Sequence, residues 1–385
     1  MNVIFVGLSG IPYKKRACDT RLLSFAEAFA AKGNNITILN RYPVSFKSER
    51  VVDQELSSNI CVIELFEREK PLRLFSILLL TFLSYAKEFV WLIRQNNKEC
   101  VDIIHLYSGH YFEFFHYYII SKIIRAKIVY QYVEVRSSQN RNGMYHKING
   151  FLCDRFGYKF FDGVISISTY IDNMVKTLSP VLPTIKVPPI CNIGYYDVFK
   201  PLSIKEPYIM FCGSSDYLEV INLIIDSYRL SEISKKHKLI LVLSGSEKSK
   251  NQVKTYANGD AEIKSALQYK DLITLYLGAS ALLIPLRNTI QDVARVPNKI
   301  CEYTACKGLI ITTNNGEIPY FFKDEKNALI AKDFSVEEIS KKLNLVLKMN
   351  NQEIFQMKEE AYQVCKSFFD ISVYSDSLDK FLREL

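Results

Sequence analysis

The sequence has little that would support a disulfide framework, a zinc site or a membrane span. Its nine cysteines stand singly between Cys18 and Cys365 without a CxxC pair, and the closest two, Cys301 and Cys306, fit no common zinc spacing. Such an unpatterned set in a long chain is typical of a reducing compartment. The most apolar stretch, residues 74–86, has 13 residues, fewer than the roughly 20 that cross a bilayer. The first residues also lack a signal-peptide pattern, so we expect a cytoplasmic protein.

The chain is long enough for two domains, and its charge is unevenly placed. It has 385 residues, of which 48% are hydrophobic and 23% charged, as in ordinary folded proteins. The net charge is +8. Residues 1–200 hold 25 Lys and Arg against 17 Asp and Glu, whereas residues 201–385 hold 24 of each. The positive excess therefore lies in the first half, and a functional interpretation has to account for it.

Short β-rich runs alternate with helical patterns along the whole chain. The runs lie at residues 2–7, 36–39, 102–106, 127–135, 164–168, 208–212, 239–243, 280–286 and 309–313. This alternation predicts an α/β fold with parallel, doubly wound sheets. Six of the twelve prolines fall within residues 180–207, which marks that segment as a linker.

We therefore predict two Rossmann-like domains. The first spans residues 1–195, and the second spans residues 196–369. A helix over residues 370–385 is expected to pack back on the first domain. Because ligands of such sheets bind at the carboxyl ends of the strands, two sheets that face each other would form an interdomain cleft.

Basic residues gather just before and within a helix near the end of the second domain. Arg287, Arg295 and Lys299 surround a helix start at Pro297, where free N–H groups and the helix dipole favour an anion. Asn298 and Glu302 share a helix face with Lys299. This grouping suits a nucleotide diphosphate, with Glu302 placed for ribose hydroxyls. The plainer interpretation is a solvated, charged helix face.

The same stretch resembles the retaining glycosyltransferases of family 4, which have the GT-B fold. Residues 297–306, PNKICEYTAC, are similar to the family's P-x-K-x-x-E-Y-x-A-C run, and residues 311–319 to its strand and G-G-I-P-E turn. Gly10 lies in a segment similar to the first β-turn-α unit, and Gly213, followed by Ser214, is similar to the glycine that opens the second domain. The resemblance implies that these residues and Glu302 bind a nucleotide-sugar donor.

Two departures from the family pattern bear on the donor phosphates. Ala294 stands where the family has the first glutamate of its E-x7-E motif, and Asp292 comes two residues too early. No cation follows Gly213, although the family has an Arg and a Lys there. We expect Arg287, Arg295 and Lys299 to supply that charge instead. The resemblance implies transfer without a metal or cofactor, in agreement with the lack of an Asp-x-Asp motif.

The first domain is expected to bring acceptor and catalytic groups to the cleft. His110 follows a strand on a loop, and Glu134 ends the next strand, so both are candidate catalytic residues. The plainer interpretation is an exposed histidine and a surface ion pair between Glu134 and Arg136. His105 is read as a buried histidine at a strand end.

Basic and aromatic residues of the first half predict contact with an anionic membrane. The candidates for acceptor or membrane contact are Lys14, Lys15, Arg16, Arg73, Lys87 and Trp91. They accompany a nearly all-apolar helical pattern at residues 72–93, which fits a membrane surface and also fits a helix packed in the core. No nucleic-acid motif is present.

The leading hypothesis is a retaining glycosyltransferase that moves a sugar from a nucleotide-diphosphate sugar to a lipid-linked or polysaccharide acceptor. Its setting would be bacterial surface polysaccharide synthesis at the inner face of the cell membrane. A nucleotide-sugar 2-epimerase of the same fold is one alternative. A non-catalytic GT-B partner subunit is another, suggested by Ala294 and the missing cations after Gly213.

Overall fold

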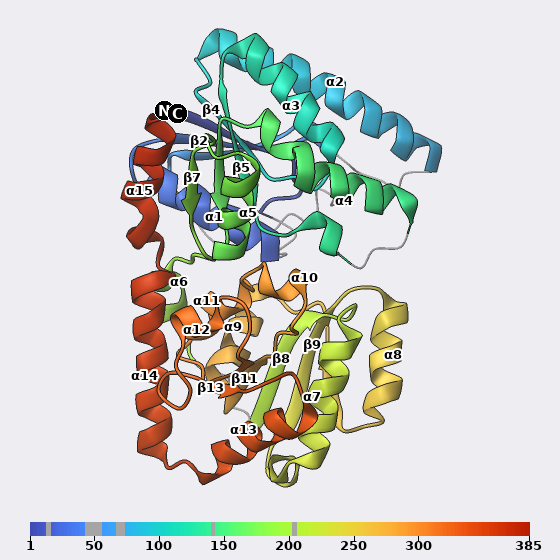
Figure 1. Cartoon of the computed structure of the whole chain (residues 1–385), viewed down its shortest axis with the longest axis vertical. Coiled ribbons are helices and arrows are strands. Elements are labelled where there is room, and N and C mark those ends of the chain that lie inside the picture. The colour runs from blue at the N-terminus through green and yellow to red at the C-terminus, as the bar shows by residue number, and fades with distance from the viewer. Residues whose placement is uncertain (13–16, 43–55, 67–73, 140–142, 202–205) are drawn as a thin grey trace. The chain divides into compact units, whose positions relative to one another are not determined.

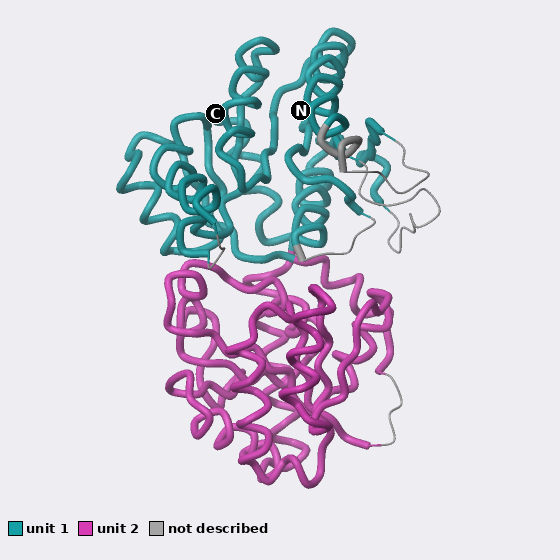
Figure 2. The backbone as a smooth tube through the Cα atoms, turned by 90° about the vertical axis from the view of Figure 1, so that its right-hand side faces the viewer, with its two compact units in different colours: residues 1–190, 371–385 teal, residues 191–370 magenta. Residues whose placement is uncertain are grey.

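The chain folds into two compact units, which are described separately below. The computed structural model describes all residues except 13–16, 43–55, 67–73, 140–142 and 202–205. Unit 1 comprises Met1–Ile190 and Ile371–Leu385, and unit 2 comprises Cys191–Asp370 (Figure 2). The chain thus leaves unit 1 once and returns to it with its last helix.

Unit 1 is built on a parallel sheet with the strand order β3-β2-β1-β4-β5-β6-β7 (Figure 1). Its strands are β1 (Asn2–Val6), β2 (Asn35–Asn40), β3 (Ile60–Glu64), β4 (Ile103–Leu106), β5 (Lys127–Tyr132), β6 (Gly163–Ser166) and β7 (Thr184–Lys186). The helices are α1 (Ala17–Ala30), α2 (Leu74–Lys98), α3 (Tyr111–Ile124), α4 (Met144–Phe156), α5 (Thr169–Leu178) and α15 (Ile371–Arg383). The strand order reverses between β1 and β4, so their carboxyl ends form the usual ligand-binding point of such a sheet.

The last helix, α15, completes the core of unit 1. Leu378 and Leu382 are buried among residues of α1 and the central strands. Two polar contacts fix the helix at its edge: Asn34 Nδ2 donates to Asp379 Oδ1 at 2.8 Å, and Lys32 Nζ lies 2.5 Å from Asp376 Oδ1. Unit 1 therefore depends on both ends of the chain.

His105 belongs to the core of unit 1. Its ring stacks on Phe5 with centroids 4.2 Å apart, and Phe25 and Phe29 also contact it. Burial lowers its pKa to about 3, because the charged ring would lose its water. The side chain is therefore a neutral core group, as the sequence analysis interpreted it.

Helix α2 turns polar groups inward and apolar groups outward. Ser84 and Glu88 are fully buried, and Tyr117 donates a 3.0 Å hydrogen bond to Glu88 Oε1. Phe82 is 75% exposed and Leu83 is 46% exposed. The interpretation of this segment as a helix packed in the core holds for Leu92, which is fully buried, but not for Phe82 and Leu83. A soluble helix ordinarily shows the opposite pattern.

Unit 2 has a second parallel sheet, ordered β10-β9-β8-β11-β12-β13. The strands are β8 (Tyr208–Ser214), β9 (Lys238–Ser244), β10 (Ala261–Lys264), β11 (Ala281–Ile284), β12 (Ile310–Thr313) and β13 (Leu329–Ala331). The helices are α6 (Ile193–Asp197), α7 (Leu218–Leu230), α8 (Glu247–Ala257), α9 (Tyr269–Gly278), α10 (Ile290–Val293), α11 (Lys299–Ala305), α12 (Ile318–Phe321), α13 (Val336–Lys348) and α14 (Asn351–Phe368).

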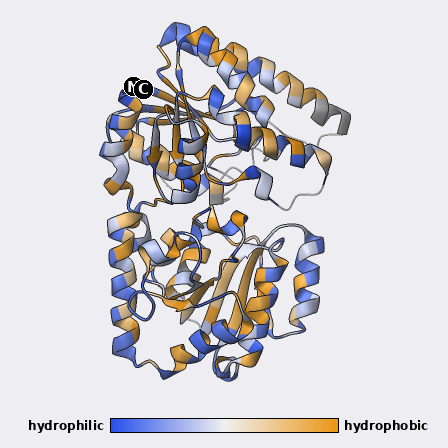
Figure 3. Cartoon of the chain, in the orientation of Figure 1, coloured by the Kyte–Doolittle hydropathy of each residue, from blue (hydrophilic) through white to orange (hydrophobic). Residues whose placement is uncertain are grey.

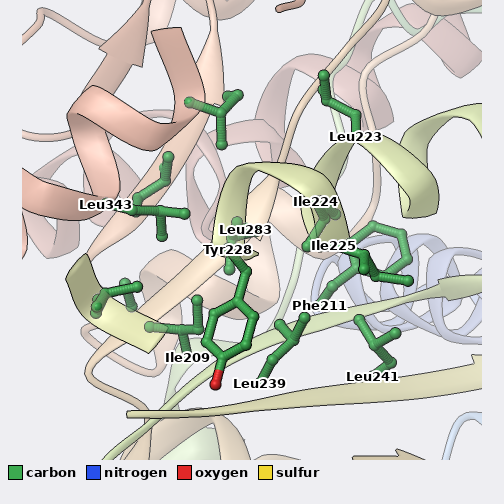
Figure 4. Packing of buried hydrophobic residues seen from close by; sticks show 14 of the residues in the cluster. Ile209, Phe211, Leu223, Ile224, Ile225, Tyr228, Leu239, Leu241, Leu283 and Leu343 are labelled. Carbon is green, nitrogen blue, oxygen red and sulfur yellow. The ribbon is translucent and has the colours of Figure 1, made fainter. Parts of the chain in front are cut away.

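The core of unit 2 is a continuous apolar cluster. Ile209, Leu239 and Leu241 of the sheet pack against Ile224 and Tyr228 of α7 (Figure 4). Burial on both faces explains why these strands read as uninterrupted apolar runs. The switch point of this sheet lies between β8 and β11, whose carboxyl ends carry the candidate site.

The proline-rich segment contains more structure than a linker. The strand β7 and the helix α6 lie within residues 180–207. Pro183 precedes β7 and Pro188 follows it, and β7 is the last strand of its sheet, where a neighbouring proline removes no ladder hydrogen bond.

Candidate donor site

The carboxyl end of β8 is shaped by Gly213 and Ser214. A Cβ on Gly213 would lie 2.6 Å from the ring of Phe211, so only glycine lets this strand pass the ring. The hydroxyl of Ser214 donates to Asp216 Oδ2 and accepts from the Asp216 N–H, each at 3.2 Å. These bonds hold the turn that leads into α7.

A buried carboxylate joins the two arginines that the sequence analysis selected. Asp292 Oδ2 accepts from Arg287 Nε at 2.7 Å and from the Arg287 backbone N–H at 3.0 Å. Asp292 Oδ1 accepts from Arg295 Nη2 at 2.7 Å and from Arg287 Nη2 at 3.2 Å. Asp292 is completely buried, so it fixes both guanidinium groups at the end of β11.

The cluster of Arg287, Asp292 and Arg295 keeps a positive excess. Burial alone would raise the pKa of Asp292, but the Arg287 hydrogen bonds and the Arg295 charge lower it, so the carboxylate is ionised. Two cations share this one buried anion. Glu219, 3.3 Å from Arg287 Nη1, is largely exposed and adds a screened negative charge at the rim.

Tyr217 connects this cluster to the loop after β8. Its hydroxyl accepts from Arg295 Nη1 at 2.6 Å, and the Arg295 guanidinium lies 4.8 Å from the centre of its ring. The sequence analysis did not select Tyr217 or give Asp292 a role. The three-residue spacing of Asp292 and Arg295 was the available signal, because it places the two side chains together on one helical turn.

Lys299 and Glu302 form a second, separate pair on α11. Lys299 Nζ donates to Glu302 Oε2 at 2.8 Å. Burial works to lower the pKa of Lys299, but the Glu302 carboxylate raises it above its ordinary value. The other carboxylate oxygen, Glu302 Oε1, is buried and has no hydrogen-bond partner within the described residues. An unsatisfied anionic acceptor of this kind is suited to a hydroxyl donor.

The start of α11 differs from the expectation. The helix begins at Lys299 with Asn298 as its N-cap, so Pro297 lies outside the helix. The helix has seven residues, too few for a strong macrodipole. The positive charge at this edge of the sheet therefore comes chiefly from the side chains.

The other predicted site residues lie in unit 1. Gly10 adopts a positive φ of 92°, and its N–H donates to Asn40 Oδ1 at 2.7 Å. His110 is the N-cap of α3, and its Nδ1 lies 3.2 Å from the Tyr145 hydroxyl. Glu134 Oε2 lies 3.6 Å from Arg136 Nη1, the ion pair that the plainer interpretation expected.

The predicted acceptor and membrane residues are only partly described. Lys14, Lys15, Arg16 and Arg73 lie outside the described residues. Lys87 donates to the Leu65 carbonyl, and its Nζ lies 4.3 Å from the centre of the Phe66 ring. Trp91 is half-buried on α2. In the described part of the chain, no helix is long and apolar enough to span a membrane.

A family comparison bears directly on this site. Residues 197–364, which include every donor-site residue of unit 2, match a protein-family model. The model is described as Glycosyl transferases group 1. No curated protein matches the chain. The group 1 match covers the arginine cluster and the Lys299–Glu302 pair.

Solved structures give the fold of the whole chain. Sucrose-phosphate synthase from Thermosynechococcus elongatus has a TM-score of 0.77 at 13% identity, covering 100% of this chain and 98% of that one. Anabaena Alr3699/HepE in complex with UDP-glucose has a TM-score of 0.69 at 15% identity, covering 100% of both chains. WaaG, a glycosyltransferase involved in lipopolysaccharide biosynthesis, has a TM-score of 0.64 at 12% identity, covering 98% and 99%. The chain has the two parallel-sheet domains of the GT-B fold.

Proposed function

We propose that this protein is a retaining glycosyltransferase of family 4. It moves a sugar from a nucleotide-diphosphate donor to a lipid-linked or polysaccharide acceptor in bacterial surface polysaccharide synthesis. The observation that carries the proposal is the pair of arginines held by Asp292 at the carboxyl edge of the sheet, inside the group 1 match. The UDP-glucose complex of the HepE neighbour supports a donor of this class.

The charged groups of unit 2 supply the electrostatics of sugar transfer. When the sugar–phosphate bond breaks, negative charge develops on the leaving diphosphate, and fixed cations stabilise that charge without rearranging. Arg287 and Arg295 take this role, and Ser214 and Asn298 are further donor-binding residues. Glu302 accepts from the ribose hydroxyls, while Lys299 holds its carboxylate in place. No metal or cofactor is part of this scheme.

The groups of unit 1 act on the acceptor. His110 and Glu134 are the candidates to orient the acceptor hydroxyl or assist its deprotonation. They lie close to Arg136, because His110 and Arg136 line one pocket and Glu134 pairs with the same guanidinium. A 2-epimerase or a non-catalytic partner subunit would share the fold but show no transfer to an acceptor.

The donor class is tested by thermal unfolding of the purified protein. UDP, GDP, dTDP, ADP and their sugars are added separately. A ligand that binds the native state raises the melting temperature according to its concentration over its Kd. We expect one nucleoside diphosphate and its sugar to raise it by several degrees. Absence of a shift with any of them at millimolar concentration would contradict the proposal.

Membrane contact is the second part of the proposal, and it rests on exposed apolar side chains of unit 1. They are Leu79, Phe82, Leu83 and Val90 on α2, Phe112, Phe115, Ile119 and Ile123 on α3, and Met144, Tyr145, Ile148 and Phe151 on α4. Helix α3 contacts both α2 and α4. Parts of these helices are orange in Figure 3, where orange marks hydrophobic residues. We call this set the apolar face. Its size and its setting in the positive half of the chain suit an anionic bilayer.

The bilayer assignment predicts the behaviour of paired variants. Phe82→Ser/Leu83→Ser is expected to lower co-sedimentation with vesicles of phosphatidylcholine and phosphatidylglycerol at least threefold at low salt. Both side chains are exposed, so folding is unaffected. Leu230→Ser/Phe355→Ser, which removes an exposed Leu and Phe of unit 2, is the matched control and retains wild-type binding. Equal sedimentation of the two variants would refute the assignment.

A further inference from the structure

The pocket lined by His110 and Arg136 lies in unit 1, at the point where the chain leaves β4 and β5. It is a small pocket of about 30 Å³ that opens to solvent. His110 and Arg136 come from the segments after the two strands, and His146 and Lys147 come from the first turn of α4. Among the described residues that line it, none is acidic. Glu134 lies outside this lining but pairs with Arg136 Nη1 at 3.6 Å, so the positive excess of the pocket comes chiefly from Lys147.

Arg136 is held in this pocket by two glycines, by a backbone oxygen and by its ion pair with Glu134. A Cβ on Gly109 would lie 2.7 Å from the guanidinium carbon, and a Cβ on Gly150 would lie 2.9 Å from the Arg136 carbonyl. Arg136 Nη2 donates to the Ser108 carbonyl at 3.3 Å, and its Nε is buried without a partner in the described residues. Only 13% of the side chain is exposed. The cation is thus fixed in position instead of being free on the surface.

Lys147 and the α4 backbone add to this positive field. Within the described part of the chain, the Lys147 ammonium has no hydrogen-bond or ion-pair partner, and α4 begins at Met144 with Gly143 as an N-cap that has no side chain to bond the first N–H groups. Asn149 is committed elsewhere, since it accepts from the Tyr111 N–H at 2.9 Å and donates to the Gly109 carbonyl at 2.7 Å. A bound anion would meet Arg136 and Lys147 together.

The apolar face borders this pocket. Lys147 lies three residues after Met144, four before Phe151 and next to Ile148, and all three apolar side chains are more than half exposed. Residues three and four apart are neighbours on a helix surface. Tyr145, also exposed, contacts His110. A cationic pocket and an apolar stripe therefore share one side of α4.

We infer that this pocket binds the phosphoryl group of an amphiphilic acceptor, whose hydrocarbon chain lies on the apolar stripe of α4. The inference rests on the proposed function, because it names the class of acceptor: a lipid phosphate or diphosphate. A lipid phosphate and a free phosphate ion carry the same negative phosphoryl group, so Arg136 and Lys147 could bind either of them. The apolar stripe favours the lipid, since burial of each CH₂ group of its chain adds to the binding free energy.

The test measures ligand binding to the full chain by calorimetry. The probes are dodecyl phosphate below its critical micelle concentration, inorganic phosphate and the neutral dodecyl maltoside. We expect dodecyl phosphate to bind at least tenfold more tightly than either of the others. Lys147→Glu is expected to lower the affinity for dodecyl phosphate at least tenfold. The control is Arg155→Glu, which makes the same charge change at the other end of α4 and outside the pocket. It is expected to change the affinity for dodecyl phosphate less than threefold.

Each opposite outcome would overturn the inference. Wild-type affinity in Lys147→Glu excludes the pocket, and equal affinity for inorganic phosphate excludes the amphiphile. Equal affinity for dodecyl maltoside excludes the phosphoryl group. The nucleotide-induced thermal shift, measured on the same proteins, reports on unit 2 independently. If dodecyl phosphate binds but no nucleotide shifts the melting temperature, the proposed function is contradicted. If a nucleotide shifts the melting temperature but dodecyl phosphate does not bind, the phosphate pocket is contradicted.

Discussion

The double variant Arg287→Gln/Arg295→Gln is expected to bind its nucleoside diphosphate about 100-fold more weakly than the wild type. A hydrogen bond to a charged group contributes about 1.5–3 kcal/mol, and loss of both guanidinium groups amounts to about 3 kcal/mol. Glutamine is preferred to alanine because its amide can still donate to the buried Asp292 carboxylate. The affinity is measured by calorimetry with the diphosphate that gives the largest thermal shift.

A matched arginine serves as the control for this experiment. Arg229 also bonds two carboxylates, Asp226 Oδ1 at 3.1 Å and Asp260 Oδ2 at 2.7 Å, but it lies on the outer side of α7 near α8. Arg229→Gln should leave the affinity within twofold of the wild type. If the double variant folds, as judged by circular dichroism, and still binds with wild-type affinity, the arginines do not hold the diphosphate.

The variant Glu302→Gln is expected to lose 10- to 100-fold in affinity for the same ribonucleotide. The amide is neutral, so the ribose hydroxyls lose a charged acceptor at Glu302 Oε1, worth about 1.5–3 kcal/mol. Lys299 also loses its buried counter-ion. The readout that separates ribose recognition from general damage is a 2′,3′-dideoxy nucleotide, which should bind the wild type and the variant equally.

Glu219→Gln is the control for the Glu302 variant. Its carboxylate is largely exposed at the rim and lies 3.3 Å from Arg287. Exposed ion pairs contribute at most about 1 kcal/mol, so we expect at most about a fivefold change in affinity. A dideoxy nucleotide that loses as much affinity as the ribonucleotide in Glu302→Gln would show that the carboxylate acts on the pocket as a whole and not on the ribose.

The interior of each sheet could be read from the sequence, whereas the edges could not. The nine runs predicted as strands correspond to the inner strands of both sheets. The strands that escaped prediction, β3, β7, β10 and β13, are the four sheet edges. Inner strands are covered on both faces and read as apolar runs. An edge strand such as β10, with no fully buried residue, lacks that signal.

The sequence predicted which residue types form the candidate site, but it did not predict which of their side chains pair with each other. The charges of Arg287, Arg295 and Lys299 pointed to an anion site, yet the pairing with Asp292 and Glu302 depends on side-chain positions in the folded loop. The sequence analysis considered Asp292 only as an acidic residue two positions before the expected first glutamate of the E-x7-E motif. The pocket in unit 1 had no sequence signal, because Arg136 and Lys147 come together only when α4 packs against the segment that follows β5.

The return of α15 to unit 1 has a consequence for the order of events during synthesis. All of unit 2 leaves the ribosome before Leu378 and Leu382, which fill the core beside α1. Unit 2 can therefore finish folding while unit 1, although translated first, still exposes the α1 face that α15 will cover. In this chain, the half that begins last is the first that can be completed.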